Sequence, residues 1–454
     1  MKASHSSHVV VGAGLPGIAA SLALAKRGLD VVLLDSAPEI GGLLRSYEVD
    51  GFAFDYGTHF ANRTGIGELD DLLFGGFESE WIEFPALRAG NRWNGVLNEA
   101  NDNPDVNTLG RDLHDRCLAE LLSAPGWTSD EAPGSARSYL LAEYGPTLVS
   151  EFFDPVLKKF TGLASEDLHH QANRLFNLKR FAVLDPSSTD ELKRSERFDA
   201  KVSYHHRDRF GGHRACLYPR SGGIGTWIGQ LAGKLEAAGV EVRSDARIEG
   251  IGTEGDRVGH LLVNGDRIGV DHLIWTAAPA AFCKLAGTGF DGPRPQSRAT
   301  VLAGLVFDRP FLTDCHYVTV FEPLLKSFRA TFYPNFRNDG EGRHAATLEF
   351  MCGPHEMEGS DWIVTAVDEL SEMGTVAEDA RLLSGHVKFI PNGFPVQTNE
   401  SVEGLARQVE SIRNFANVDL GGRSSGEGWF LDGLIRGAYE AALKVAEHAA
   451  CTNR

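Results

Sequence analysis

Three glycines near the N-terminus have the spacing of a phosphate-binding turn. Gly12, Gly14 and Gly17 form the pattern G-x-G-x-x-G, after the apolar run Val9–Val11 and before a segment rich in alanine and leucine. The apolar run predicts a buried parallel strand, and the next segment predicts a helix that Gly28 ends. In such a unit the glycines permit a tight turn, a close approach of the backbone to a pyrophosphate and close packing of helix on strand. The helix N-terminus then offers free N–H groups to the phosphates.

An acidic residue follows at the position that this unit needs. Residues 30–34 predict a second strand, and Asp35 comes directly after it. A carboxylate there accepts hydrogen bonds from the ribose hydroxyls of a dinucleotide. Pro16 suits the first helical turn, where its missing N–H costs little. The strand, turn, helix and acid together predict a dinucleotide-binding unit.

A second glycine pair indicates that the dinucleotide is a flavin. Gly41-Gly42 follows shortly after Asp35 and marks another close approach of backbone to ligand. Nicotinamide-binding units do not need this element, whereas flavin-binding units often carry it. Farther on, Phe52 and Phe54 alternate as in a strand, and Asp55-Tyr56-Gly57 predicts the turn after it.

Composition and charge exclude several classes of function. The 44 Lys and Arg residues against 62 Asp and Glu give a formal net charge of −18, which argues against binding to nucleic acid or to anionic lipid. Six cysteines are scattered without a C-x-x-C pair, so we expect neither a disulfide framework nor a metal site. No apolar run reaches the roughly 18 residues of a membrane helix. We therefore expect a cytoplasmic protein with a small-molecule substrate and no membrane contact, and the sequence predicts no oligomeric state.

The order of elements predicts an α/β fold with two interleaved domains. A Rossmann-like domain, a parallel sheet with helices on both sides, is expected from residues 1–60, 216–290 and 411–454. An α+β substrate-binding domain is expected from residues 61–215 and 291–410. In the first domain, Asn264-Gly265-Asp266 predicts a hairpin turn, 272–275 a separate buried strand, and 434–448 a long final helix.

These segments together resemble the superfamily of flavin-dependent amine oxidases, protoporphyrinogen oxidases and phytoene desaturases, with the UDP-galactopyranose mutases as more distant relatives. The resemblance covers residues 1–60, 216–280 and the C-terminal segment from Gly421. It implies tightly bound FAD, held without a covalent bond because no cysteine stands in the stretch before the final helix. The sequence departs from the pattern ahead of Gly41, where Ala37-Pro38 replaces the usual arginine and Arg45 is the candidate replacement.

The resemblance also implies which residues contact FAD. The backbone of Ile248 corresponds to the position that meets the adenine, and the terminal segment places a helix N-terminus near the flavin, which favours an anionic reduced ring. The expected cofactor-binding residues are Gly12, Gly14, Leu15, Pro16, Gly17, Asp35, Ser36, Gly41, Gly42, Leu43, Arg45, Gly57, Thr58, His59, Ile248, Thr276, Ala277, Gly422, Arg423, Asp432, Gly433 and Leu434.

Three functions remain open at this point. The first is an oxidoreductase that transfers a hydride from a small polar metabolite, with a sugar or nucleotide sugar as candidate, to flavin N5. Its apolar slot is expected from Phe328, Phe332, Tyr333 and Phe336. The second is a redox-neutral enzyme like the galactopyranose mutases, with NAD(P)H as candidate reductant. The third is a non-catalytic FAD-binding scaffold.

Arginines and one histidine are the candidates for substrate chemistry. A diphosphate clamp in the second function would draw one or two members from a set of seven arginines. These are Arg174, Arg180, Arg207, Arg209, Arg214, Arg329 and Arg337. The stretch Asp55–Phe60 resembles the mutase segment whose histidine lies beside the flavin, with Thr58 in place of a proline. His59 is therefore the predicted catalytic residue, and the alternative is a structural hydrogen bond at a strand end.

Overall fold

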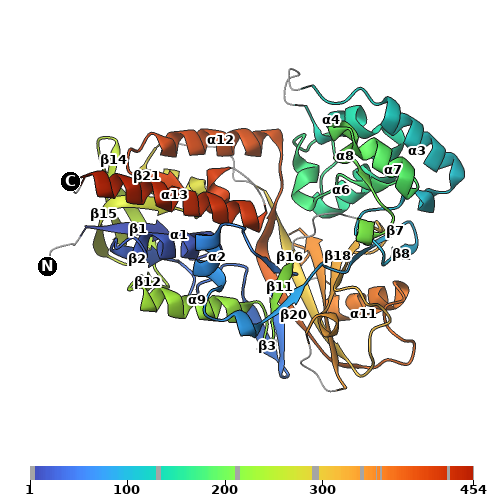
Figure 1. The fold of residues 1–454 in the computed structure, drawn as a ribbon, viewed down its shortest axis with the longest axis horizontal. Helices are drawn as coiled ribbons and strands as arrows, with labels where there is room; N and C mark the ends of the chain where they lie inside the picture. The colour runs from blue at the N-terminus through green and yellow to red at the C-terminus, as the bar shows by residue number, and fades with distance from the viewer. Residues whose placement is uncertain are drawn as a thin grey trace.

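Two large sheets organise the molecule, and Figure 1 shows them at opposite ends of its long axis. The computed structural model describes residues 6–128, 134–209, 215–288, 296–337, 342–353, 355–357, 360–426 and 430–452. The predicted α/β class is confirmed, whereas the predicted domain boundaries stay a prediction. No helix in these described ranges is long and apolar enough to cross a membrane.

The first sheet is parallel at its centre and antiparallel at one edge, which is the predicted Rossmann-like arrangement. Parallel pairing joins β12 (Glu241–Arg243), β2 (Val31–Leu34), β1 (Ser6–Val11), β15 (Asp266–Trp275) and β21 (Val418–Leu420). The antiparallel edge consists of β14 (Arg257–Val263) and β13 (Ile248–Glu254).

Strand β15 differs from the prediction because it is one continuous strand. The sequence predicted a hairpin arm and a separate strand at 272–275. Instead, residues 266–269 pair antiparallel with β14, and 273–275 pair parallel with β21 on the same side. Burial of alternate residues up to Val270 and of every residue in Leu273–Trp275 follows this change of environment. The predicted turn is confirmed, with positive φ at Asn264 and Gly265.

Helices cover both faces of the first sheet. On one face, α1 (Leu15–Ala25), α9 (Gly225–Ala237) and α13 (Leu431–Thr452) pack with Val10, Leu33 and Ile274 in one apolar core. α2 (Gly67–Phe74) shares this core although it lies beyond residue 60. On the other face, α10 (Pro279–Ala286) and the end of α12 (Asn399–Arg413) pack against Val9 and Val11. α13 begins three residues before the predicted start, so Asp432 and Gly433 lie in its first turn.

The second sheet carries helices on two sides (Figure 1). Its strands, in spatial order, are β20 (Leu382–Pro395), β16 (Ser297–Phe307), β19 (His344–Cys352), β18 (Ser327–Phe332), β17 (Tyr317–Val320), β7 (Ala89–Trp93) and β8 (Val96–Asn98). One apolar core joins this sheet to α11 (Trp362–Glu372). A second core joins it to a helical layer, α3 (Arg111–Ser123), α4 (Ala136–Tyr144), α5 (Pro146–Leu148), α6 (Asp154–Thr161), α7 (Pro186–Lys193) and α8 (Glu196–Asp199).

Three small sheets connect the larger ones. The first orders β5 (Ala61–Asn62), β11 (Cys216–Pro219) and β6 (Trp81–Phe84); the second pairs β9 (Phe181–Ala182) with β10 (Val202–Ser203). The third is a hairpin of β3 (Ser46–Val49) and β4 (Phe52–Asp55). This hairpin leads directly from the second glycine pair to the predicted catalytic segment, so it determines where His59 lies.

A buried carboxylate at the end of β4 joins segments that are distant in sequence. Asp55 is 2% exposed and accepts hydrogen bonds from Ser46 Oγ (2.6 Å), Tyr218 Oη (2.6 Å) and the Ile224 N–H (2.9 Å). Its own N–H donates to Tyr333 Oη at 3.0 Å. Since each donor is held by a different part of the chain, Asp55 connects the hairpin, the start of α9 and the second sheet.

We expect Asp55→Ala to lower the free energy of unfolding by about 3 kcal/mol, because it leaves buried donors without an acceptor. Urea unfolding of the purified protein measures the loss. Glu48→Ala is the matched control, since Glu48 lies exposed in the same hairpin and its replacement should cost less than about 0.5 kcal/mol. Equal urea midpoints for the two variants would contradict this role.

Candidate functional site

Each of the three glycines of the first motif occupies its position for a different structural reason. A Cβ on Gly12 would collide with Thr276 Oγ1, and one on Gly17 would collide with the carbonyl oxygen of Gly12. A Cβ on Gly14 would meet nothing closer than Pro16 Cδ, at 3.8 Å, and the φ of −70° at Gly14 suits any residue. The protein itself therefore requires Gly12 and Gly17, whereas the space before Gly14 is left open for a ligand.

The second glycine pair lies directly against the first motif. The Gly41 N–H donates to the Ala13 carbonyl at 2.7 Å, and a Cβ on Gly42 would lie 3.5 Å from Gly14 Cα. Arg45, the candidate replacement for the missing arginine, holds the Gly42 carbonyl through Nε at 2.7 Å. Its guanidinium lies 4.9 Å from the centroid of the Tyr56 ring. Leu43 lies between these contacts and is partly buried.

Asp35 shapes the turn as well as facing the predicted ribose position. Its Oδ2 accepts the Ala13 N–H at 2.6 Å, and its Oδ1 accepts the Ala37 N–H at 2.8 Å. Each oxygen keeps a lone pair for a ribose hydroxyl. The Ala246 N–H donates to the Asp35 carbonyl at 2.8 Å, which brings Ile248 to this end of the sheet. Ser36, beside Asp35, is exposed.

The strand ends of β1 and β15 and the C-terminal segment converge at the same edge. Thr276 Oγ1 donates to the carbonyls of Val11 (2.8 Å) and Gly12 (3.0 Å), with Ala277 next to it. A Cβ on Gly422 would lie 3.3 Å from Pro16. The segment from β21 therefore reaches the N-terminus of α1, which begins at Leu15.

The N-terminus of α13 follows this segment in the chain. The Leu434 N–H is the first within the described part of this segment to find a carbonyl, that of Phe430 at 3.1 Å. Leu434 is itself buried, and its contact with the cofactor stays a prediction. Asp432 pairs with Arg436 at 3.2 Å, whereas Gly433 is exposed. The helix N-terminus is thus suited to an anionic group.

Arg423 is a cation without a counter-ion among the described residues. Burial lowers its pKa, and the charges of Arg423 and Arg329 both lower the pKa of His59, so the two guanidinium groups lie near the imidazole. A guanidinium without an ion pair among the described residues, an open glycine turn and a helix N-terminus fit the phosphates and ring of FAD. The predicted cofactor residues present here therefore suit that group.

A buried ion pair between Arg329 and Glu349 holds the predicted catalytic segment, residues 55–60. Glu349, in β19, is 1% exposed and lies directly opposite Arg329 in β18. Arg329 Nε and Nη2 donate to its two oxygens at 2.6 and 2.9 Å. Burial alone would raise the pKa of Glu349, but Arg329 lowers it overall. The carboxylate also accepts the N–H and hydroxyl of Thr58, at 3.1 and 2.8 Å.

Gly57 and His59 owe their positions to this ion pair. Gly57 has φ +103°, and a Cβ there would lie 3.0 Å from Glu349 Oε2. His59 is half-buried, with Nε2 3.3 Å from the Tyr56 carbonyl. Sequence analysis missed Glu349. The available signal was one acid within an otherwise apolar strand, residues 344–352.

A cavity of about 270 Å³ adjoins the ion pair on the side of the helical layer. Of the arginines considered for substrate binding, Arg180 and Arg329 line it. Arg337 instead donates to the Ala53 carbonyl at 2.7 Å, and Arg207 to the Ala89 carbonyl at 2.9 Å. Arg214 lies outside the described residues.

The predicted aromatic slot is only partly present. Phe328 lines the cavity. Phe332 is buried in the core beside α11, and Tyr333 and Phe336 are buried in the core of the first sheet. An irregularity between Ser327 and Arg329 explains the separation, because it turns Phe328 to the face opposite to Phe332.

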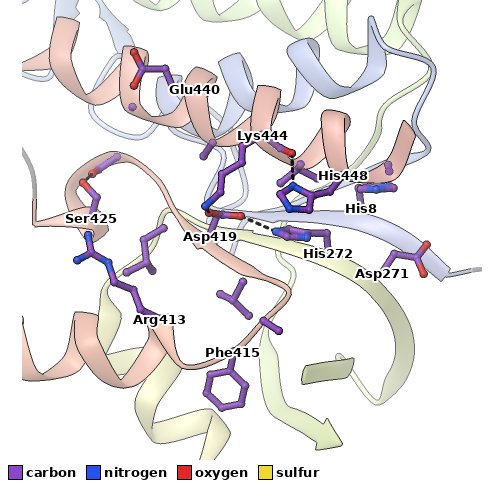
Figure 2. A pocket seen from close by; sticks show the side chains of 18 of the residues that line it. His8, Asp271, His272, Arg413, Phe415, Asp419, Ser425, Glu440, Lys444 and His448 are labelled. Atoms are coloured by element: carbon purple, nitrogen blue, oxygen red, sulfur yellow. Dashed lines mark hydrogen bonds and ion pairs between the residues drawn. The ribbon is translucent and has the colours of Figure 1, made fainter. Parts of the chain in front are cut away.

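A larger groove of about 1140 Å³ runs along α13, away from the predicted catalytic residue. Figure 2 shows His272, Asp419 and Lys444 converging there. His272 Nε2 lies 2.8 Å and Lys444 Nζ 3.4 Å from the Asp419 carboxylate. These charges compensate one another and hold α13 to β15 and β21. Among the described residues no group of three or more His, Cys, Asp or Glu could hold a metal ion.

Gly14→Ala should leave the fold intact and prevent retention of FAD, because the added methyl group contacts no protein atom but occupies the approach to the pyrophosphate. Flavin absorbance per mole of purified protein measures the loss, and circular dichroism checks the fold. Gly229→Ala, in α9, is the control, since a Cβ there meets nothing within 4 Å. Full flavin content in Gly14→Ala would show that this turn does not bind the cofactor.

Comparisons with known proteins agree with this arrangement. Residues 10–73 match the family of NAD(P)-binding Rossmann-like domains. A reduced UDP-galactopyranose mutase has a similar fold, with a TM-score of 0.76 and 19% identity over 99% of this chain and 96% of that one. A putrescine oxidase with bound putrescine gives a TM-score of 0.65 and 16% identity over 98% and 100% of the two chains.

Curated relatives match over shorter stretches. The 4,4'-diapolycopene oxygenase of a Methylomonas species is 25% identical over 296 residues, which cover 59% of this chain and 54% of that protein. The chain spans less than two thirds of the length of the curated relatives that it matches. The fold and the N-terminal dinucleotide-binding unit are therefore similar to those of a UDP-galactopyranose mutase, a protoporphyrinogen oxidase and a putrescine oxidase, in agreement with the resemblance that the motifs predicted.

Proposed function

We propose that the protein is a FAD-dependent oxidoreductase whose substrate reaches the flavin through the cavity beside Arg329. One observation carries the proposal: Arg329 and Arg423, which has no ion pair among the described residues, both act on His59, and Arg329, paired with Glu349, also lines the cavity. When bound, FAD supplies the ring that accepts a hydride from a substrate carbon. The chain itself supplies orientation, exclusion of water and a place for a proton.

The imidazole of His59 is neutral, so one of its ring nitrogens can accept a hydrogen bond. Burial lowers its pKa to about 4, with Arg329 and Arg423 acting in the same direction and Glu349 opposing them. The ring is therefore neutral at physiological pH and carries one N–H. Because a carbonyl only accepts, that N–H is Nε2–H, which donates to Tyr56 at 3.3 Å. Nδ1 is then left as an acceptor for a proton at the reacting centre.

A second candidate is a redox-neutral rearrangement of a nucleotide sugar, with NAD(P)H as the reductant. The observation in its favour is that Arg180 and Arg329 line one cavity, where two guanidinium groups suit a diphosphate. The similarity in fold to a UDP-galactopyranose mutase is consistent with it. The two candidates differ in whether substrate reduces the oxidised protein.

His59→Ala should keep FAD and lose most of its turnover, by about 100-fold or more, the lower range for loss of a general acid–base group. His59→Gln is the informative companion, because its amide can replace the bond to Tyr56 but cannot take up a proton. Turnover near the wild-type rate in His59→Gln would leave His59 with a structural role only.

Turnover should also show no histidine titration near pH 6.5. The lowered pKa means that His59 stays neutral as pH falls from 8 to 5 and is protonated only near its value of about 4. We therefore expect kcat to be level across that interval and to fall below it. Steady-state rates of the wild-type protein in overlapping buffers measure this, and a loss of rate centred near pH 6.5 would contradict the assignment.

An anaerobic titration of the oxidised protein separates the candidate functions. Bleaching of the flavin absorbance by amines or alcohols establishes an oxidoreductase and identifies the bond that is oxidised. A saturable spectral shift without bleaching, given only by nucleotide sugars, favours the redox-neutral candidate. Retention of FAD with neither response would favour a non-catalytic flavoprotein.

A further inference from the structure

The walls of the cavity beside Arg329 are mainly aromatic. Seven phenylalanines line it, and rings from α6, β18 and β20 contact one another: Phe160 and Phe328 lie 5.9 Å apart between centroids, and Phe328 and Phe394 5.6 Å apart. Phe430, just before α13, lines the same cavity and is 57% exposed. An aromatic wall with an exposed ring at one end is suited to a planar apolar group.

The size of the cavity limits that group. About 270 Å³ is at the lower end of small-molecule pockets. It holds one or two fused rings rather than a chain of carotenoid length. We expected a small polar metabolite as substrate, yet residues 204–209, the described part of a segment rich in Arg and His, do not line the cavity. The walls of the cavity are therefore aromatic, although the segment 204–209 is polar.

Three cations, Lys179, Arg180 and Arg329, lie in the same lining. Lys179 has no ion pair among the described residues, and its pKa is lowered by burial and then by the charges of Arg180 and Arg174. Arg180 shares the carboxylate of Asp199 with Lys193, so this group of cations has one acid between them. Like charges held together in this way cost free energy, which a bound anion would recover.

The other charged residues of the lining do not neutralise Lys179 and Arg180. Arg329 is already paired with Glu349 in two hydrogen bonds. Asp102 is the single carboxylate of the lining; it accepts a hydrogen bond from Asn103 and influences Tyr317 rather than Lys179. The cavity thus has a cationic side at Lys179 and Arg180, beside its aromatic walls.

We propose that the substrate is an aromatic or similarly planar apolar compound that carries one anionic group, with the anion on Lys179 and Arg180 and the ring among Phe160, Phe328 and Phe394. This rests on the proposed function, because it takes the cavity lined by Phe430 and Arg329 as the place where the reacting carbon lies. The anion fixes orientation, and the apolar body is held by contact area, so neither half alone binds well.

Calorimetric titration of the oxidised holoenzyme tests this with three probes. 2-Naphthyl phosphate has both features, 2-naphthol lacks the anion, and uridine diphosphate has the anion without the fused apolar ring. We expect 2-naphthyl phosphate to bind at least ten-fold more tightly than either of the others, and its affinity to fall as salt is added. Equal affinity for 2-naphthol, or tighter binding of uridine diphosphate, would overturn the proposal.

Substitutions test which residues of the cavity bind the anion and which bind the aromatic ring. Lys179→Met keeps the apolar stem and removes the charge, so 2-naphthyl phosphate should bind about ten-fold more weakly while 2-naphthol is unaffected. Lys158→Met, at an exposed position of α6 outside the lining, is the matched control. Phe328→Leu should weaken both ligands by the same factor. Unchanged affinity in both Lys179→Met and Arg180→Met would overturn the anion site.

The flavin spectrum separates this proposal from the proposed function. Binding is measured with FAD content known, so it does not depend on turnover. Protein purified without FAD and unable to take it up would contradict the oxidoreductase. A holoenzyme that another class of substrate reduces, and that binds none of the probes, would leave the oxidoreductase in place and overturn the anionic aromatic substrate.

Discussion

The burial of two carboxylates, Asp55 and Glu349, is the constraint on which the site depends. Both are almost fully buried, so each needs donors that satisfy its oxygens in full. Asp55 takes them from the hairpin and from the start of α9, while Glu349 takes them from the opposite strand and from Thr58. Asp55 begins the segment 55–59, and Glu349 binds Thr58 near its other end. The segment between these two contacts therefore has little freedom to move.

Rigidity of this kind allows the first and second sheets to meet at a fixed distance. The first sheet supplies the turn at Gly14 and the end of β15; the second supplies β18 and β19. Beside His59, Phe60 packs against Tyr218 and Phe336, with ring centroids 5.7 and 5.0 Å apart, so aromatic contacts act with the polar ones to determine the alignment. Removing one partner of a buried ion pair lowers the free energy of unfolding by about 3–5 kcal/mol. We therefore expect the alignment of the two sheets to be lost as a whole rather than by degrees.

Local constraints explain why the dinucleotide-binding unit could be predicted from the sequence. Gly12 and Gly17 are required by atoms a few residues away or by one neighbouring strand, so the spacing itself carries the information. The extent of β15 was not predicted, because its pairing changes along its length and depends on β14 and β21. The Arg329–Glu349 pair depends on the register between β18 and β19, which composition does not encode. For the same reason Phe328 could not be separated from Phe332 by alternation alone.

The charge of the protein has a consequence for how such a site would select its ligand. A formal net charge of −18 gives no long-range attraction for anions, and beyond about 8 Å salt screens the field of individual surface groups. Lys179, Arg180 and Arg423 therefore act only at short range, inside spaces where the dielectric constant is low and each contact is strong. Selectivity then comes from the rate at which a matched ligand leaves rather than from the rate at which anions arrive. Anions that cannot also fill the aromatic walls would thus leave the cavity quickly.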